Sequence, residues 1–105
     1  MTVDDEDLDT YTIQEGTKKL MTYLFHSCNL LTSITIPDSV IKIGYYICNQ
    51  CAALENITVD PNNTIYDSRN NCNAIIETST NTLIAGCNNT TIPDSIIKIG
   101  KYAFR

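Results

Sequence analysis

A single offset of 23 residues relates many apolar positions of this chain, and no other feature constrains its fold as strongly. The offset connects Ile13 with Ile36 and Val59. The same offset connects Leu20 with Ile43, Tyr23 with Tyr46, Leu24 with Ile47, Cys28 with Cys51, Leu31 with Leu54, and Ile34 with Ile57. A further copy follows an insertion, because ITIPDSVIKIGYY at 34–46 recurs as TTIPDSIIKIGKY at 90–102. One such unit cannot bury its own apolar side, so the sequence predicts stacked units that share a continuous core.

Each unit has three parts. A short alternating strand comes first, as at 54–59, with Leu54, Ile57 and Val59 as its apolar markers. Pro-Asp-Ser then predicts a turn at 37–39 and 93–95, because Pro fixes φ and Asp hydrogen-bonds its own backbone. A second short apolar piece at 41–44 leads into an expected helix of about two turns at 45–51. The pattern therefore predicts a strand-rich α/β repeat whose equivalent strands lie about 4.8 Å apart.

The insertion between the second and third copies has the pattern of a β-hairpin. Two apolar segments at 73–77 and 82–86 flank Thr78-Ser79-Thr80-Asn81, so we expect a hairpin at about 72–87. A symmetric turn would pair Ile75 with Ile84, Ile76 with Leu83, and Cys72 with Cys87. The hairpin would then replace the helical part of its unit.

The charge of the chain is concentrated at its start. The formal net charge is −5, and five of the twelve acids are Asp4, Asp5, Glu6, Asp7 and Asp9. The other seven acids balance the seven bases, so the repeats are neutral overall. A neutral body offers no basic face to phosphates, so neither nucleic acid nor an anionic membrane is an expected partner. The pattern predicts a flexible acidic lead at 1–10 and one repeat domain at 11–105, in a chain that is 43% hydrophobic.

A calcium loop is the functional alternative for the acidic lead. Asp5, Asp7 and Asp9 alternate like the first ligands of such a loop. However, Thr10 stands where the loop needs Gly, and Gly16 stands where it needs Glu. No apolar run is long enough to span a membrane, and no signal-peptide pattern is present.

The five cysteines are the residues whose side chains could most readily carry metal or redox chemistry. Cys48 and Cys51 form a CxxC motif, but at the end of the expected helix rather than at its start, where redox motifs lie. Zinc could recruit Cys28 and His26 as further ligands, although a second CxxC is lacking. The repeat favours structural thiols over metal or redox chemistry. The structural set is Cys28, Cys48, Cys51, Cys72 and Cys87. A disulfide between the hairpin pair stays open.

No catalytic constellation is found, so we expect no enzyme activity, no catalytic residue, no cofactor and no metal. His26 is the only histidine, and Cys28 lies two positions away, where helical side chains diverge. The chain has no Gly-rich phosphate loop, no GxSxG motif, and no acid pair on one strand face.

Polar residues that alternate with the core positions are the candidate binding residues. Stacked by the repeat, they form two ladders, Ser33, Asn56, Asn89 and Thr35, Thr58, Thr91. Such a face offers regularly spaced hydrogen-bond donors and acceptors to a protein or a glycan. The alternative is that Thr simply suits exposed strand positions.

Several segments resemble a known family. They are LTSITIPDSVIKIG (31–44), ITVDPNNTIYDS (57–68), CNAIIETSTNTLIAGC (72–87) and TTIPDSIIKIGKYAF (90–104). Over residues 11–105 they are similar to the BspA-like leucine-rich repeats of bacterial surface proteins. This resemblance implies a right-handed solenoid of short strands and short helices. The repeat itself places the units at about 11–33, 34–56 and 57–105. It also implies a cell-surface or secreted location, adhesion to a protein or glycan of a host or neighbouring cell, and no catalytic motif.

The final residues suggest an unfinished array. Residues 101–105 stop inside the expected helix, so we expect a fragment whose exposed end can form an end-to-end homodimer. The leading function is a non-catalytic binding module of an adhesin-like protein. One alternative is a structural spacer in a larger surface protein. Another is a carbohydrate-active enzyme, which would need clustered acids on one face.

Overall fold

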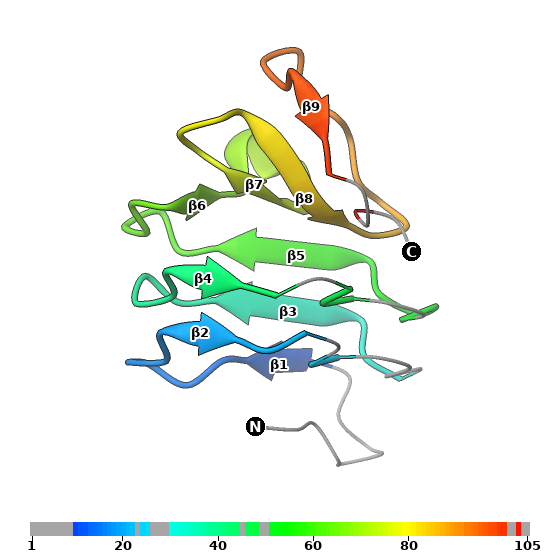
Figure 1. Cartoon of the computed structure of the whole chain (residues 1–105). Helices are drawn as coiled ribbons and strands as arrows, with labels where there is room; N and C mark the ends of the chain where they lie inside the picture. Colours follow the sequence, from blue (N-terminus) through cyan, green and yellow to red (C-terminus); the bar gives the residue numbers. More distant parts are fainter. Residues whose placement is uncertain are drawn as a thin grey trace.

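The computed structural model describes residues 10–22, 24–25, 30–44, 46–48, 51–100 and 103. Within these ranges, nine short strands and one 3-10 helix follow each other (Figure 1). They are β1 (Thr10–Thr12), β2 (Lys19–Leu20), β3 (Ser33–Ile36), β4 (Lys42–Ile43), β5 (Asn56–Val59), β6 (Tyr66–Asp67), η1 (Arg69–Asn71), β7 (Ala74–Glu77), β8 (Thr82–Gly86) and β9 (Lys98–Ile99). Within these ranges there is no α-helix, and hence none long and apolar enough to cross a membrane.

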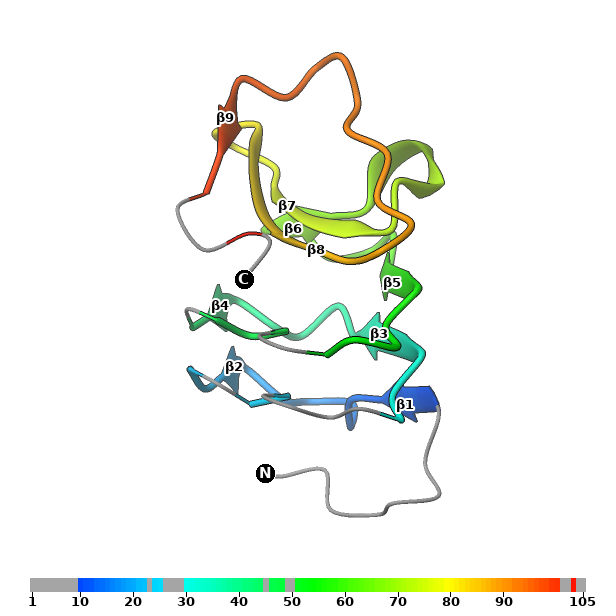
Figure 2. The same cartoon turned by 90° about the vertical axis from the view of Figure 1, so that its right-hand side faces the viewer.

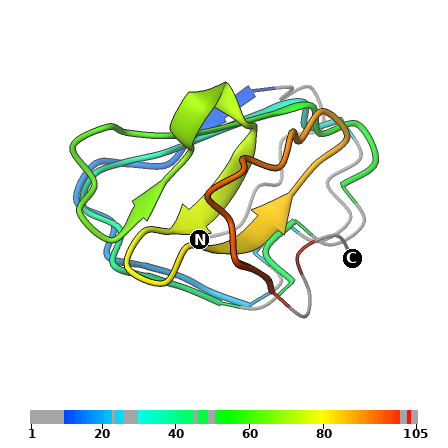
Figure 3. The ribbon, with the colours of Figure 1, turned by 90° about the horizontal axis from the view of Figure 1, so that it is seen from above.

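The strand register confirms the 23-residue repeat. β1, β3 and β5 form a parallel sheet in which Tyr11 pairs with Ile34 and Ile34 with Ile57. β2 and β4 form a second parallel pair, with Leu20 opposite Ile43. The two sheets lie on opposite sides of the stack (Figure 2), and the successive coils overlie each other from above (Figure 3). Each of the first two units therefore contributes one rung to each side, whereas the third unit adds only β5, to the first sheet.

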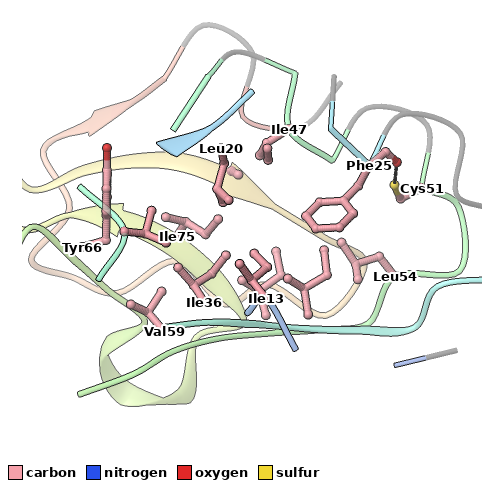
Figure 4. Close-up of a cluster of buried hydrophobic side chains, with 14 of the residues drawn as sticks. Ile13, Leu20, Phe25, Ile36, Ile47, Cys51, Leu54, Val59, Tyr66 and Ile75 are labelled. Carbon is pink, nitrogen blue, oxygen red and sulfur yellow. Dashed lines mark hydrogen bonds between the residues drawn. The ribbon is translucent and has the colours of Figure 1, made fainter. Parts of the chain in front are cut away.

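The first core fills the space between these two sheets (Figure 4). Alternate strand residues point inward, so Ile34, Ile36, Ile57 and Val59 are buried while their strand neighbours are not. Leu20 and Phe25 close the core from the opposite side of the coil, and the Phe25 ring meets Tyr11 edge-on at 5.7 Å.

The expected helix at 45–51 is wrong where the structure describes it. Tyr46, Ile47 and Cys48 form a turn, and Tyr46 has a φ of 56°, which a right-handed helix does not contain. A helix would direct the Cys51 N–H to the Ile47 carbonyl. Instead, Cys51 N donates to Cys48 O (3.3 Å), and Ile47 O accepts from Phe25 N in the preceding unit (3.1 Å). A hydrogen bond between units has therefore replaced one within a helix.

The hairpin is present, but its predicted register holds only near the turn. Ile76 pairs with Leu83 as expected, whereas Ile75 pairs with Ala85 rather than with Ile84. Ile84 is thus the extra residue of a β-bulge. As a result Ile84 and Ala85, adjacent in sequence, both pack against the first core.

The hairpin separates two cores. The hairpin belongs to a four-stranded sheet in the order β6-β7-β8-β9. This sheet comes after β5 in the sequence, at the position where the earlier units turn back towards their second strand. Ile75 and Ala85 face the first core. A smaller second core lies on the other face and consists of Cys72, Ala74, Ile76, Leu83 and Ala103. β9, the repeat counterpart of β4, pairs in parallel with β8, and Ile96, shortly before it, packs against this second core.

One buried polar side chain joins the second unit to the third. The Asn63 amide group donates to Pro37 O and Val40 O, both at 3.0 Å. Its carbonyl accepts from Ile65 N and Tyr66 N, both at 2.8 Å. All of the hydrogen-bonding capacity of the Asn63 side chain is used, so this polar group is buried with every donor and acceptor satisfied.

Candidate functional site

Two polar rows cross the outer face of the β1–β3–β5 sheet. In one row Thr12 pairs with Thr35, and Thr35 with Thr58. In the other, the backbone of Thr10 pairs with Ser33, and Ser33 with Asn56. These residues alternate with inward-facing positions, so the rows lie on the face opposite the first core. We call these two rows the polar ladder.

The polar ladder offers neutral hydrogen-bonding groups at regular intervals. Thr12, Asn56 and Thr58 are exposed, whereas Ser33 and Thr35 are half-buried. Hydroxyl groups both donate and accept, and the amide of Asn56 adds one acceptor and two donors. Adjacent rungs of a sheet lie about 4.8 Å apart. The ladder can therefore hydrogen-bond an uncharged, extended ligand, and none of its side chains is an acid or a base.

The two residues expected on the third rung lie outside the sheet. Asn89 and Thr91 belong to a turn and the loop after it, and Thr91 N donates to Cys72 O (3.0 Å). The outer edge of β5 is occupied by other groups, since Val59 N donates to Ser68 Oγ (3.0 Å). Asn88 still hydrogen-bonds Leu54 O (3.2 Å) and Ala52 O (2.7 Å) just before β5, but no strand follows at 89–92, so the expected third rung is not part of the sheet.

The sequence reasoning missed the first rung. Thr10 and Thr12 precede Ser33 and Thr35 by the same 23 residues. The offset itself would have found them, but the first copy has Gln14-Glu15-Gly16 where the others have a proline turn, which hid it. The ladder therefore spans β1, β3 and β5 and does not continue onto the hairpin.

The densest polar cluster is structural. The guanidinium of Arg69 donates to both carboxylate oxygens of Asp67 at 2.8 and 2.7 Å, and also to Asn81 Oδ1 (2.7 Å) and Ser95 Oγ (3.0 Å). Thr78 Oγ1 donates to Asp67 as well (2.7 Å). Burial works to raise the pKa of Asp67, but these hydrogen bonds and the charge of Arg69 hold the pKa below its usual value. The cluster ties β6, the hairpin turn and the loop before β9 together.

The hairpin cysteines are free thiols in different environments. Cys72 is buried in the second core, whereas Cys87 packs against the first. The bulge shifts the strands by one residue, so Cys87 Sγ meets Asn73 O (3.3 Å) instead of Cys72. Burial raises the pKa of the Cys72 thiol, which lowers its reactivity. No disulfide therefore joins this pair.

The remaining cysteine predictions concern the turn at the end of each unit. Cys51 is buried, and its thiol donates to the Phe25 carbonyl (Figure 4), while half-buried Cys48 packs against the first core. The structural role of both cysteines stays a prediction. His26 and Cys28, the other members of the hypothetical zinc set, lie outside the described residues. Among the residues that are described, no three His, Cys, Asp or Glu side chains gather closely enough to hold a metal ion.

Comparison with known proteins agrees with this architecture. The family profile described as BspA type leucine-rich repeat region (6 copies) matches residues 4–105. No curated protein matches the chain.

Two solved structures share the fold. A leucine-rich repeat protein from Eubacterium ventriosum superposes with a TM-score of 0.78 and 24% identity, over 90% of this chain and 26% of that one. A leucine-rich cell surface protein from Faecalibacterium prausnitzii gives a TM-score of 0.53 and 24% identity, over 94% of this chain and 39% of that one. The chain thus spans less than half of either protein. Because the family profile covers nearly its whole length, the chain belongs to the BspA-type leucine-rich repeat family.

Proposed function

We propose that this chain is a non-catalytic binding module that holds a protein or a glycan on the polar ladder. The observation that carries the proposal is the register: uncharged polar residues repeat on neighbouring parallel strands, while Ile34, Ile36, Ile57 and Val59, which alternate with them on β3 and β5, are buried. Repeat proteins use extended sheet faces of this kind for binding.

The proposed setting is a cell-surface or secreted protein of adhesin type. Its support is the family membership and the similarity to a protein described as a leucine-rich cell surface protein. The right-handed sense of the solenoid is part of this proposal as well. The partner would be a protein or glycan of a host or neighbouring cell.

The test is a binding screen of the chain against immobilised matrix proteins and a glycan array. The affinity of any ligand found is then measured for the double variant Thr35→Arg/Thr58→Arg, which fills the centre of the ladder with bulky charged groups. We expect affinity to fall at least about tenfold, the effect of losing about 1.4 kcal/mol of binding free energy.

The matched control is Thr64→Arg, because Thr64 is exposed but lies outside the ladder. The control should bind like the unmodified chain, and both variants should unfold at the same temperature. Full affinity of the double variant would remove the ladder from the proposal. Absence of any ligand would favour the spacer alternative, and turnover of a glycan would favour the enzyme.

A further inference from the structure

Two rows of like charges run side by side along the first two units. Glu15 and Asp38 form an acidic row, and Lys19 and Lys42 form a basic row; the members of each row are 23 residues apart. All four side chains are exposed. In each unit the lysine follows the acid by four residues, so the two rows lie within about 14 Å of each other. We call these four residues, together with Ile41, the charged ridge.

The stacking of the units brings like charges together within each row. Lys19 pairs with Lys42 in the parallel register of β2 and β4. The turns that hold Glu15 and Asp38 are joined beside these residues, because the Ser39 hydroxyl hydrogen-bonds two backbone groups of the preceding turn. Like charges on adjacent strands repel each other and destabilise a sheet. Both rows therefore carry an electrostatic cost.

The described part of the chain contains no ion pair that neutralises these rows. The one ion pair found there joins Arg69 to Asp67. The repeats are neutral as a sum, but their charges are separated on the surface. The last unit repeats the pattern with Asp94 and Lys98, which are also exposed, and β9 lies on the same side of the molecule as β2 and β4 (Figure 2).

An exposed apolar side chain lies between the rows in the sequence. Ile41 is 53% exposed, although its unit lies between the first and the third. Further repeats stack on the ends of an array and contact only their neighbours, so additional units of chain would not cover this side. An apolar centre with charged groups around it is the usual composition of a protein–protein contact.

We propose that a second copy of this chain covers the charged ridge, in a side-by-side dimer whose two-fold axis is parallel to the stack. Rotation about this axis exchanges the two rows. Asp38 then faces Lys42 of the second copy, and Glu15 faces Lys19 of the second copy, while the two Ile41 side chains meet near the axis. An axis within the face and at right angles to the stack would instead set acid against acid. A two-fold contact of this kind closes at two copies.

A second copy fits this surface better than a polyanion does. A polyanion would neutralise the basic row, but the neighbouring acidic row would repel it. A second copy relieves the repulsion within both rows at once. Lys18, which holds the position of Ile41 in the first unit, can turn its long side chain to Glu15 of the second copy. Exposed ion pairs are individually weak, so the association needs high protein concentration and weakens with salt.

Sedimentation over a range of protein concentrations tests the proposal. At low ionic strength we expect the mass to rise from 11.7 kDa towards twice that value. In about 1 M salt the dissociation constant should be at least about tenfold larger, because the facing charges are screened.

Charge reversal tests which rows face each other. Asp38→Lys and Lys42→Glu should each weaken self-association at least about tenfold, because each change sets like charges opposite each other twice. An equal mixture of the two variants should associate again, since every facing pair then has opposite charges. Glu55→Lys is the matched control, with the same change of charge at an exposed acid outside the ridge, and it should associate like the unmodified chain.

Each other outcome overturns the proposal. A constant mass of 11.7 kDa at low ionic strength would exclude the second copy, and retention of that single chain on a sulfated polysaccharide resin would assign the basic row to a polyanion. Two weakened variants that do not recover on mixing would show that the rows do not face each other. Thermal unfolding, monitored by circular dichroism, checks that each variant is folded. If Asp38→Lys does not fold, Glu15→Lys mixed with Lys19→Glu makes the same test in the first unit.

Discussion

At the scale of single residues, this fold depends on side chains that join one unit to the next. Asn63 is the clearest case, because its amide hydrogen-bonds four backbone groups from two units. Ser39 does the same nearer the N-terminus, accepting from Gly16 N (3.1 Å) and donating to Thr17 O (2.8 Å). Such hydrogen bonds fix how one unit is placed on the next. The apolar core alone does not fix this, because hydrophobic contacts are not directional.

The first prediction concerns Asn63. In Asn63→Asp, a carboxylate would face the carbonyls of Pro37 and Val40, which now accept hydrogen bonds from the amide. We expect the free energy of unfolding to fall by about 3 kcal/mol or more. Chemical denaturation measures the loss. Asn62→Asp makes the same change on the exposed neighbour and should cost little; equal losses would contradict the role given to Asn63.

The second prediction concerns two glycines at equivalent positions. A Cβ at Gly44 would lie 2.8 Å from Thr22 Cα in the preceding unit, and still closer to Thr22 N. At Gly100 the nearest atom is Leu83 O, at 3.1 Å. Backbone cannot withdraw as a flexible side chain can, so Gly44→Ala should cost about 2–3 kcal/mol and Gly100→Ala clearly less. Thermal unfolding of both variants measures the order, and a larger effect at Gly100 would contradict it.

At the scale of elements, the strands and turns that recur in every unit could be predicted from the sequence. The predictions were wrong where contacts between units override the local sequence pattern. The strand register of β1, β3 and β5 and the turn at 37–39 were predictable, because they depend on the 23-residue offset and on Pro-Asp-Ser. The turn found in place of the expected helix at 45–51 was not predictable, because it depends on a hydrogen bond from Phe25 in another unit. The bulge at Ile84 escaped as well, because apolar residues occupy both candidate registers.

The candidate site was predicted in the same uneven way. Ser33, Thr35, Asn56 and Thr58 share a face as expected, because alternation along a strand determines it. The third rung failed because no strand follows at 89–92, which no local pattern reveals. Which ligand the face binds remains a prediction.

The third prediction concerns the element junction held by Asp67 and Arg69. Because the folded-state pKa of Asp67 lies below its ordinary value of 3.8, the carboxylate stabilises the fold above that pH. This contribution is lost as the pH falls through 3.8 and then through the lower folded-state pKa. Asp67→Asn should therefore cost about 1 kcal/mol at neutral pH and progressively less in acid. Unfolding from pH 7 to pH 2.5 measures the gap between the two proteins, and a gap independent of pH would contradict the prediction.

At the scale of the whole molecule, the two parallel sheets form opposite sides of the stack, and the polar ladder lies on the outer face of the β1–β3–β5 sheet. The hydrogen-bonding groups of the ladder are therefore all presented on one side of the molecule.

The hairpin also has a consequence for cooperativity. Its sheet is a wall shared by two hydrophobic interiors, with Ile75 and Ala85 on one surface and Ile76 and Leu83 on the other. Repeat arrays generally fray from their ends, since each unit contacts only its neighbours. Here, melting either interior would expose one surface of the wall to water and weaken the other interior. We therefore expect the insertion that interrupts the repeat to couple the last unit to the first two, so that the molecule unfolds in one cooperative transition.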